Sequence, residues 1–324
     1  MAPIAGKKIV ITGGTGFIAT HVAKRLADQN LLTLLGPRLE GAGFESSGLK
    51  YHPNVTRKIC DLTIPNQIEE TLGEPDIIIH TAGFVGVQKV IQQSMQAYAV
   101  NLIGTQNLLA TLADPVSGKV KRKLPDQFVN FSTSEVMGGA AYLCKETDPA
   151  MIGSSTEPRW IYAMSKLATE HICGAYHRTF NLPTVNVRPF NVYGPYRTGG
   201  HAMKVFISAA LRREPITVHG DGAQLRAWCY VDDFVDGMML LLNNPQATGR
   251  TYQIGNPACS ITMRSLAFMV KSVLSSGSEV VFIPKDYADM ELRIPDVSKA
   301  VKELGYSPKV SLEEGILLAA ESYR

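Results

Sequence analysis

The stretch KIVITGGTGFIA, Lys8 to Ala19, decides the fold of this chain. It begins with an apolar run typical of a buried strand, which a glycine-rich turn and an amphipathic segment follow at once. Gly14-x-Gly16-x-x-Ala19 matches the spacing of dinucleotide-binding loops, which accept alanine at the third position. Glycine lets the backbone approach a diphosphate, and the following helix presents free N–H groups and a positive dipole end to it. The stretch therefore predicts a strand, a phosphate-binding loop and a helix.

The same rhythm of strand and helix continues through the first half of the chain. Short apolar runs alternate with amphipathic stretches, which predicts an α/β fold with a parallel sheet covered by helices on both faces. The expected strands are 8–12, 31–35, 56–60, 76–80, 127–132 and 184–188, and the expected helices are 17–29, 65–72, 89–113 and 160–180.

The second half is less regular and predicts a smaller lobe. It has a loop with Pro and Gly at 189–200, helices at 201–213 and 232–243, a turn at 219–222, and a tail with two or three helices and a strand at 279–283. We therefore expect a doubly wound Rossmann domain at 1–188, to which 226–256 returns. The remaining segments, 189–225 and 257–324, would form an α/β substrate lobe.

Composition excludes several classes of protein. With 324 residues, 45% of them hydrophobic, the chain can bury a large core, and its net charge of +3 is too small to indicate nucleic acid. No window approaches the roughly 18 apolar residues of a membrane span. The five cysteines are scattered without metal-ligand spacing, as in a reduced cytoplasmic protein. We expect a cytoplasmic protein with no metal site and no membrane or nucleic-acid partner.

Tyr162 and Lys166 are four residues apart in the helix expected at 160–180, so they share one helical face. An ammonium group beside a phenol favours the phenolate, which lowers the tyrosine pKa and creates a general base. Upstream, the strand at 127–132 runs into Ser132-Thr133-Ser134-Glu135, a cluster of hydroxyls with one carboxylate. Together with the phosphate loop, these residues predict an acid/base centre beside a dinucleotide.

With these residues in view, the chain resembles the extended short-chain dehydrogenase/reductase family, in its nucleotide-sugar epimerase, dehydratase and decarboxylase branch. The resemblance covers nearly the whole chain. Its motifs are Thr12-Gly13-Gly14-Thr15-Gly16-Phe17-Ile18, Asp61-Leu62, His80-Thr81-Ala82-Gly83, Asn101 with Gly104-Thr105, Ser132-Thr133-Ser134-Glu135, Tyr162-x-x-x-Lys166, Arg188-Pro189-Phe190-Asn191-Val192-Tyr193-Gly194-Pro195, Gly220-Asp221-Gly222 with Gln224 and Arg226, and Tyr230-Val231-Asp232-Asp233.

The resemblance implies a bound nicotinamide cofactor, a nucleotide-sugar substrate, and a homodimer formed through helices 89–113 and 160–180. The residues it implies around the cofactor are Gly13, Gly16, Phe17, Ile18, Arg38, Asp61, Leu62, Thr81, Ala82, Gly83, Asn101, Tyr162 and Lys166. Those implied in catalysis are Thr133, Ser134, Glu135, Tyr162, Lys166 and Arg226, and those on the substrate are Asn191, Lys204 and Arg226. Tyr162 and Thr133 would contact the sugar 4-hydroxyl.

The choice between NAD and NADP depends on the end of the second strand. Dinucleotide folds usually place an acid there to hold the ribose hydroxyls, whereas this strand ends in Gly36-Pro37-Arg38. Arg38 would suit the 2′-phosphate of NADP, or it is an ordinary loop residue and other groups hold the ribose. The branch that the chain resembles mostly uses NAD, so we expect NAD and keep NADP as the alternative.

The residues after Thr133 bear on the reaction. In the family, a 4,6-dehydratase usually has Asp then Glu after the threonine, whereas a decarboxylase has Ser then Glu and an arginine downstream. Ser134-Glu135, with the stretch 158–162 and Arg226, most resembles UDP-glucuronate decarboxylases, whose product is UDP-xylose or a 4-keto pentose. Met137 departs from the tyrosine that the family often has there.

Two alternatives stay open. Some 4-epimerases have a similar strand end, so the chain could be a UDP-sugar 4-epimerase acting on UDP-glucose, UDP-glucuronate or an N-acetyl sugar. A different class, a non-catalytic dinucleotide-binding sensor, usually loses the tyrosine or the lysine. Thr133, Tyr162 and Lys166 are all present here, which favours an enzyme.

Overall fold

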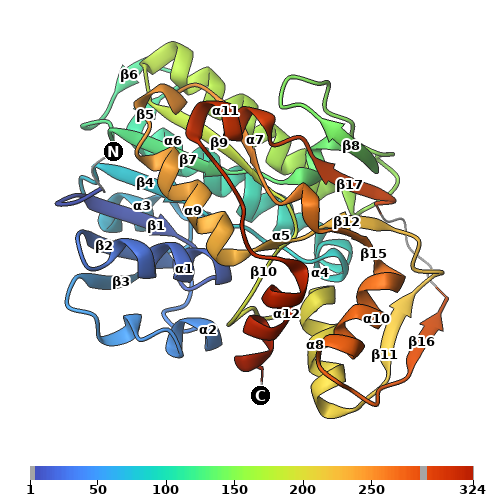
Figure 1. The fold of residues 1–324 in the computed structure, drawn as a ribbon. Coiled ribbons are helices and arrows are strands. Elements are labelled where there is room, and N and C mark those ends of the chain that lie inside the picture. The colour runs from blue at the N-terminus through green and yellow to red at the C-terminus, as the bar shows by residue number, and fades with distance from the viewer. Residues whose placement is uncertain (1–3, 285–289, 324) are drawn as a thin grey trace.

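The computed structural model describes residues 4–284 and 290–323, and in this part of the chain seven parallel strands form one sheet (Figure 1). The strand order is β14-β9-β7-β4-β1-β2-β3. The bounds are β1 (Lys8–Thr12), β2 (Leu31–Gly36), β3 (Val55–Ile59), β4 (Ile77–His80), β7 (Gln127–Phe131), β9 (Thr184–Pro189) and β14 (Thr251–Ile254). The chain moves outward from β1 first to one edge and then to the other, so the predicted Rossmann architecture is confirmed.

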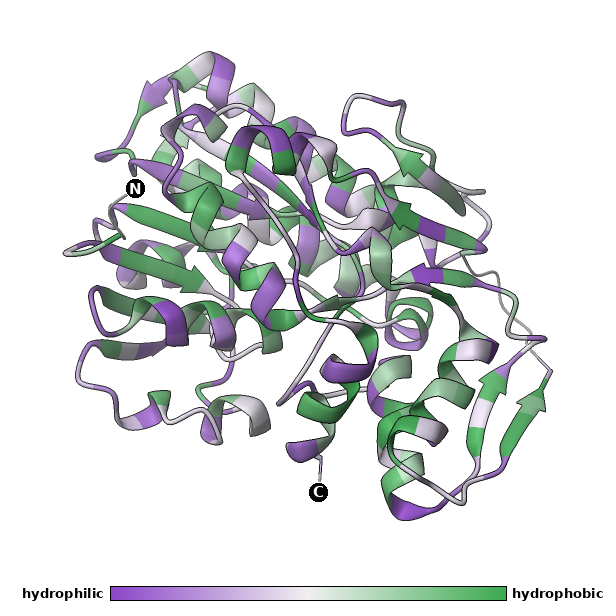
Figure 2. Cartoon of the chain, viewed as in Figure 1, coloured by the Kyte–Doolittle hydropathy of each residue, from purple (hydrophilic) through white to green (hydrophobic). Residues whose placement is uncertain are grey.

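Helices cover both faces of this main sheet (Figure 1). On one face lie α1 (Phe17–Leu26), α9 (Val231–Leu242) and α11 (Ser298–Leu304), and on the other α3 (Pro65–Thr71), α6 (Gly104–Leu112) and α7 (Trp160–Phe180). Successive side chains of a strand point to opposite faces. Ile9 and Ile11 accordingly pack on the α1 side and Val10 on the α6 side. Both faces are buried, which explains the continuous apolar strands in Figure 2.

The helix expected at 160–180 is present with those bounds, but the single helix expected at 89–113 is wrong. Helix α4 (Val87–Gln92) ends where Gln93 leaves the helical region, with φ −131° and ψ 51°. The chain resumes as α5 (Ser94–Tyr98), passes through a π-helical turn (Ala99–Ile103) and continues as α6. Such a turn widens the helix locally and often marks a functional site. Here it contains the buried Asn101.

A second sheet joins distant parts of the chain. Within the described residues it has the strand order β15-β12-β17-β8. Its strands are β8 (Ala140–Cys144), β12 (Leu225–Ala227), β15 (Ser260–Thr262) and β17 (Leu292–Pro295). The sequence analysis expected neither β8 nor β17. Strand β8 comes from the first half of the chain and pairs with β17 from the tail, so this sheet joins the two expected domains. The expected boundaries of the Rossmann domain and the substrate lobe remain a prediction.

The remaining elements build the smaller lobe and the loops around it (Figure 1). In the lobe lie α8 (Ala202–Arg212), β11 (Ile216–His219), α10 (Met263–Val273), β16 (Val280–Ile283) and α12 (Leu312–Glu321). The short elements are α2 (Ala42–Glu45), β5 (Ala113–Asp114), β6 (Lys119–Val120), β10 (Val192–Tyr193) and β13 (Cys229–Tyr230). No helix among the described residues combines the length and apolar character needed to span a membrane.

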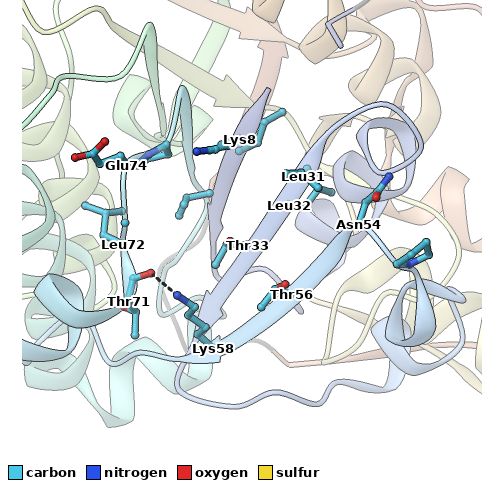
Figure 3. A pocket seen from close by; sticks show the side chains of 15 residues that line it. Lys8, Leu31, Leu32, Thr33, Asn54, Thr56, Lys58, Thr71, Leu72 and Glu74 are labelled. Carbon is cyan, nitrogen blue, oxygen red and sulfur yellow. Dashed lines mark hydrogen bonds between the residues drawn. The ribbon is translucent and has the colours of Figure 1, made fainter. Parts of the chain in front are cut away.

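A shallow hollow of about 300 Å³ lies over the outer strands of the main sheet (Figure 3). Its lining includes Lys8 and Leu31, the first residues of β1 and β2, and Thr33, Thr56 and Lys58. Lys58 Nζ donates to the Thr71 carbonyl at 3.4 Å across it. The hollow is away from the carboxyl ends of the central strands, where ligands of doubly wound sheets bind.

A buried ion pair ties α7 to the sheet. Arg188 on β9 donates from Nε and Nη2 to the two carboxylate oxygens of Glu170, at 2.8 and 2.7 Å. Its Nη1 donates to the sulfur of Met137 at 3.1 Å. The side chains of Arg188 and Glu170 are 5% and 8% exposed, so neither charge is solvated by bulk water. Loss of one partner would leave the other charge buried and uncompensated.

We expect Glu170→Gln to lower the free energy of unfolding by about 3 kcal/mol, because the Arg188 guanidinium then lacks a carboxylate in a buried site. Urea denaturation followed by circular dichroism measures the change. The matched control is Glu214→Gln, which breaks an Arg212–Glu214 pair with side chains 62% and 54% exposed. That substitution should change the free energy of unfolding far less, because water and salt screen an exposed pair. Equal losses in both variants would contradict a stabilising buried pair.

Candidate active site

The loop after β1 has the geometry of a diphosphate cradle. Gly13 has φ +66°, and a Cβ there would lie 2.8 Å from the Ala82 Cα, so a side chain is excluded. Gly14 packs closely against β2, because a Cβ at this position would lie 2.6 Å from the Leu34 Cβ. Gly16 is the N-cap of α1, and its first turn has neither a side-chain cap nor an acidic residue. The first N–H groups of α1 are therefore open to an anion, which fits a dinucleotide.

The loop after β4 forms the neighbouring wall. Thr81 Oγ1 donates to the Thr12 carbonyl at 2.6 Å, and the Ala82 N–H donates to Thr12 Oγ1 at 3.2 Å. Asn101 accepts from the Phe84 N–H at 2.6 Å and donates to the Phe84 carbonyl at 3.2 Å. Asn101 is thus placed to support the loop that the sequence analysis assigned to the cofactor.

The predicted adenine and ribose residues lie at the ends of β2 and β3. Leu62 is buried, and Asp61 accepts from the Thr63 N–H at 2.9 Å and from its hydroxyl at 2.8 Å. Arg38 is exposed. A Cβ on Gly36 would lie 3.5 Å from the Arg38 carbonyl oxygen, an ordinary contact. The backbone at Gly36 therefore accepts a Cβ, the first atom of the acid that this chain lacks.

Thr133, Tyr162 and Lys166 meet at the carboxyl end of β7. Thr133 follows that strand, and its side chain hydrogen-bonds to that of Tyr162 at the start of α7. Lys166, one turn further on, is buried and donates to the Phe131 carbonyl at 2.8 Å. Burial lowers the pKa of Lys166 to about 8. The structure therefore brings the three predicted residues together.

The electrostatics of Tyr162 differ from the expectation. Burial and, after it, the Glu135 carboxylate raise the pKa of this phenol above its ordinary value. The groups that lower its pKa are the Thr133 hydrogen bond, Arg293 and Arg197. The predicted depression of the tyrosine pKa by Lys166 is therefore not seen. The lysine ammonium is turned to the Phe131 carbonyl instead.

Glu135 lies between arginines from two elements. It belongs to the 3₁₀ helix Ser134–Met137, in which Ser134 is also buried. Its carboxylate oxygens lie 3.4 Å from Arg159 Nη2, before α7, and 3.4 Å from Arg293 Nη2 on β17. Arg293 also donates from Nη1 to the Asn191 side-chain oxygen at 3.4 Å.

Arg226 requires a correction. The resemblance implies that Arg226 acts in catalysis together with Glu135, but its guanidinium donates to the backbone carbonyls of Leu225, at 3.1 Å, and Met290. Arg293, its register partner in the β12–β17 pair, is the arginine that contacts Glu135. Asn191 has φ +38° and donates to the Ala227 carbonyl at 2.7 Å, so it lies at the edge of the same cluster.

Further cationic and aromatic groups surround this cluster. The Arg197 guanidinium carbon lies 5.0 Å from the Phe17 ring centroid, and burial lowers the pKa of Arg197 to about 10. The rings of His201 and Trp228 meet edge to face at 5.3 Å. Lys204 lies apart from Glu135, with Nζ 5.9 Å from the Tyr323 ring centroid.

The sequence analysis missed Arg293, Arg197 and His201. The Arg–Ile–Pro–Asp stretch at 293–296 gives a local signal for a strand that ends at proline, but nothing in it shows that the strand pairs with β12. Arg197 lies in the loop expected at 189–200, and His201 is the first residue of the helix expected at 201–213, where nothing in the sequence indicated a site. Within the described residues, no group of three His, Cys, Asp or Glu could hold a metal ion.

This arrangement can hold a dinucleotide, move a proton at a hydroxyl beside it and bind an anionic ligand among buried cations. The model of the NAD dependent epimerase/dehydratase family matches residues 9–255. Across 98% of this chain, UDP-glucuronic acid decarboxylase 6 of Arabidopsis thaliana is 32% identical and is covered over 89% of its length. UDP-N-acetyl-alpha-D-glucosaminuronate decarboxylase of Bacillus cytotoxicus is 29% identical, with 98% of both chains covered.

Among solved structures, the chain is similar to UDP-glucuronic acid 4-epimerase of Bacillus cereus in complex with UDP-glucuronic acid and NAD. The TM-score is 0.86, the identity 26%, and 98% of each chain is covered. UDP-glucose 4-epimerase of Thermotoga maritima, solved with UDP-glucose, has a TM-score of 0.84 at 25% identity, again over 98% of each chain. The chain therefore belongs to the NAD-dependent epimerase/dehydratase family and is an enzyme of that class.

Proposed function

We propose that the protein is a UDP-glucuronate decarboxylase that oxidises C4 of the sugar with NAD and then releases carbon dioxide from C5. The observation that supports this best is the Glu135 carboxylate between Arg159 and Arg293, beside the Thr133–Tyr162 pair. A hexuronate brings a carboxylate next to the carbon that is oxidised. Arginines whose charges act on Tyr162 suit that substrate better than a neutral sugar.

The proposed roles of the cofactor-binding residues follow the geometry. The loop Gly13–Ile18 and the N-terminus of α1 would hold the diphosphate, Asp61 and Leu62 the adenosine, and Thr81–Gly83 the nicotinamide side. Lys166 would bind the nicotinamide ribose. NAD bound there would supply the hydride acceptor for C4 and, where the reaction returns to a hydroxyl, the hydride donor.

Side chains around the sugar would transfer protons and stabilise the charges that form during the reaction. Tyr162 would act as general base and take the proton of the 4-hydroxyl, which Thr133 would orient. The phenolate that this requires is opposed by burial and Glu135 and favoured by the Thr133 hydrogen bond, Arg293 and Arg197. Once C4 is a ketone, the C5 carboxylate belongs to a β-keto acid. The C5–C6 bond breaks, its electron pair moves into the C4 enolate, and C6 leaves as carbon dioxide. Arg293 would hold the carboxylate and then the enolate charge. The proton that C5 takes up would come from water, and the Glu135 carboxylate would relay it.

The remaining residues expected to contact the substrate would bind its nucleotide part. Asn191, Arg226 and Lys204 stay proposed contacts for the diphosphate and its surroundings, since a guanidinium suits phosphate oxygens. The decarboxylase relatives in Arabidopsis and Bacillus support the reaction by their similarity over the whole chain. The alternative, a UDP-sugar 4-epimerase, is favoured by the similarity to the Bacillus cereus epimerase.

The product mass distinguishes these reactions. We expect UDP-glucuronate incubated with the protein and NAD to lose the mass of carbon dioxide, because Glu135 and Arg293 support cleavage at C5. Liquid chromatography with mass spectrometry measures this. Glu135→Gln should lower decarboxylation roughly 100-fold or more, within the range of an acid/base group. The matched control is Glu214→Gln, an exposed carboxylate on the surface of the smaller lobe.

Other products would contradict the proposal. An isomer of unchanged mass would identify an epimerase, and loss of the mass of water would identify a dehydratase. If no reduced nicotinamide forms with any UDP-sugar, the protein is a dinucleotide-binding sensor. Normal turnover by Glu135→Gln would remove that residue from the chemistry.

We propose NAD over NADP, although the acid expected after β2 is absent at Gly36. The space at Gly36 allows a direct test, since its Cβ would make an ordinary 3.5 Å contact. We expect Gly36→Asp to bind NADP roughly tenfold more weakly, because the carboxylate opposes a 2′-phosphate, and to retain NAD. Calorimetric titration with each cofactor measures this. Equal affinities of the variant for both would contradict a ribose site at Gly36.

We propose a homodimer through α7 and the segment α5–α6. Met95 of α5 and Met164 of α7 are 73% and 38% exposed, an apolar surface that a second copy would cover. We expect light scattering to show a dimer and Met164→Glu to shift it to monomer, because a charge would be buried in the interface. Met151→Glu, at an exposed methionine outside these helices, should remain dimeric. A monomeric unmodified protein would overturn the proposal.

A further inference from the structure

The loop 194–197 between β10 and α8 has a strained backbone. Gly194 has φ +154°, and Tyr196, which is not a glycine, has φ +62°. Side chains disfavour the left-handed region, so a residue stays there when its surroundings hold it. The structure shows two sets of contacts that do so.

The end of α12 holds the loop from one side. The Tyr323 hydroxyl donates to the Gly194 carbonyl at 2.7 Å and accepts a hydrogen bond from the Arg197 backbone N–H. Beside it, Ser322 Oγ accepts from the Tyr196 N–H at 3.4 Å. A single phenol hydroxyl therefore joins both ends of the loop.

Residues of helix α1 contact the loop on its other side. His21 Nε2 donates to the Pro195 carbonyl at 3.1 Å, and the His21 and Tyr196 rings lie 5.9 Å apart. The Arg197 guanidinium carbon is 5.0 Å from the Phe17 ring centroid, a cation–π distance. Phe17 is the first residue of α1, so this guanidinium lies beside the phosphate loop. Its buried Nε has no hydrogen-bond partner among the described residues.

We propose that Tyr323 is a positioning residue: its hydroxyl holds the loop 194–197 so that Arg197 stays stacked on Phe17, between the cofactor loop and Tyr162. The inference rests on the proposed function, in which Tyr162 is the general base and α1 binds the diphosphate. The positive charge of Arg197 would then stabilise both the diphosphate bound at α1 and the phenolate of Tyr162. Neither Tyr323 nor Ser322 touches the reacting atoms.

The charges around Tyr162 support this. Glu135 raises the pKa of the phenol, whereas Arg293 from β17, Arg197 from the loop and the Thr133 hydrogen bond lower it. Arg159 faces Glu135, and Lys166 lies one turn along α7. Because Arg197 favours the phenolate, losing its position should raise the pKa of Tyr162. The rising limb of kcat/KM against pH, which follows ionisation of the Tyr162 phenol, would then move to higher pH.

The test compares Tyr323→Phe with Tyr51→Phe, at an 85% exposed tyrosine. We expect Tyr323→Phe to increase hydrogen–deuterium exchange in the peptide spanning 193–200 and to leave β1 and β4 unchanged. NAD affinity by calorimetry should fall roughly threefold to tenfold, the value of a hydrogen bond. The rising limb of kcat/KM against pH should move upward. Tyr51→Phe should change none of these.

A double-mutant cycle tests whether Tyr323 acts through Arg197. Arg197→Met alone should shift the same limb, and adding Tyr323→Phe to it should change little more, because residues that act as one unit are not additive. Additive shifts, or unchanged exchange at 193–200 in Tyr323→Phe, would overturn the proposal. If the unmodified protein turns over no nucleotide sugar, the proposed function fails, while exchange and NAD affinity still decide the anchoring.

Discussion

The candidate active centre depends on one partly buried carboxylate that arginines from separate elements share. Glu135 contacts Arg159 and Arg293 at 3.4 Å each, and the exposed fractions of their side chains are 15%, 2% and 10%. Buried guanidinium groups are costly unless an opposite charge compensates them. The 3₁₀ helix after β7, the entry to α7 and strand β17 must therefore meet at Glu135. That meeting places cations beside Tyr162.

The main sheet determines where this centre lies. Strand β1 is the point from which the chain runs to both edges, and β1 and β4 are neighbours in register. Their carboxyl ends therefore bring Gly13 and Ala82 into a contact that a Cβ would obstruct. Beyond β4, strand β7 delivers Thr133 at the same edge. Cofactor loop and hydroxyl cluster thus lie side by side because the strands between them are parallel.

The sequence was sufficient wherever the physical cause is local. The apolar strands, the glycine turn before α1 and the 160–180 helix follow from patterns of neighbouring residues, and Thr133, Tyr162 and Lys166 meet as expected. Arg293 could not be found in this way, because its position depends on β17 pairing with β12, far away in sequence. The π-helical turn likewise contains a residue with a distant partner, since Asn101 hydrogen-bonds to the backbone of Phe84.

Met137 shows how a departure from a family pattern can leave a site intact. The Arg188 guanidinium donates to Glu170 from Nε and Nη2 and points Nη1 at residue 137, so this position must offer an acceptor. A tyrosine hydroxyl oxygen can accept, and so, more weakly, can a thioether sulfur, which lies 3.1 Å away here. A hydrocarbon side chain would leave a buried charged donor unpaired. Met137 thus joins the 3₁₀ helix that carries Glu135 to the buried Arg188–Glu170 pair behind the site.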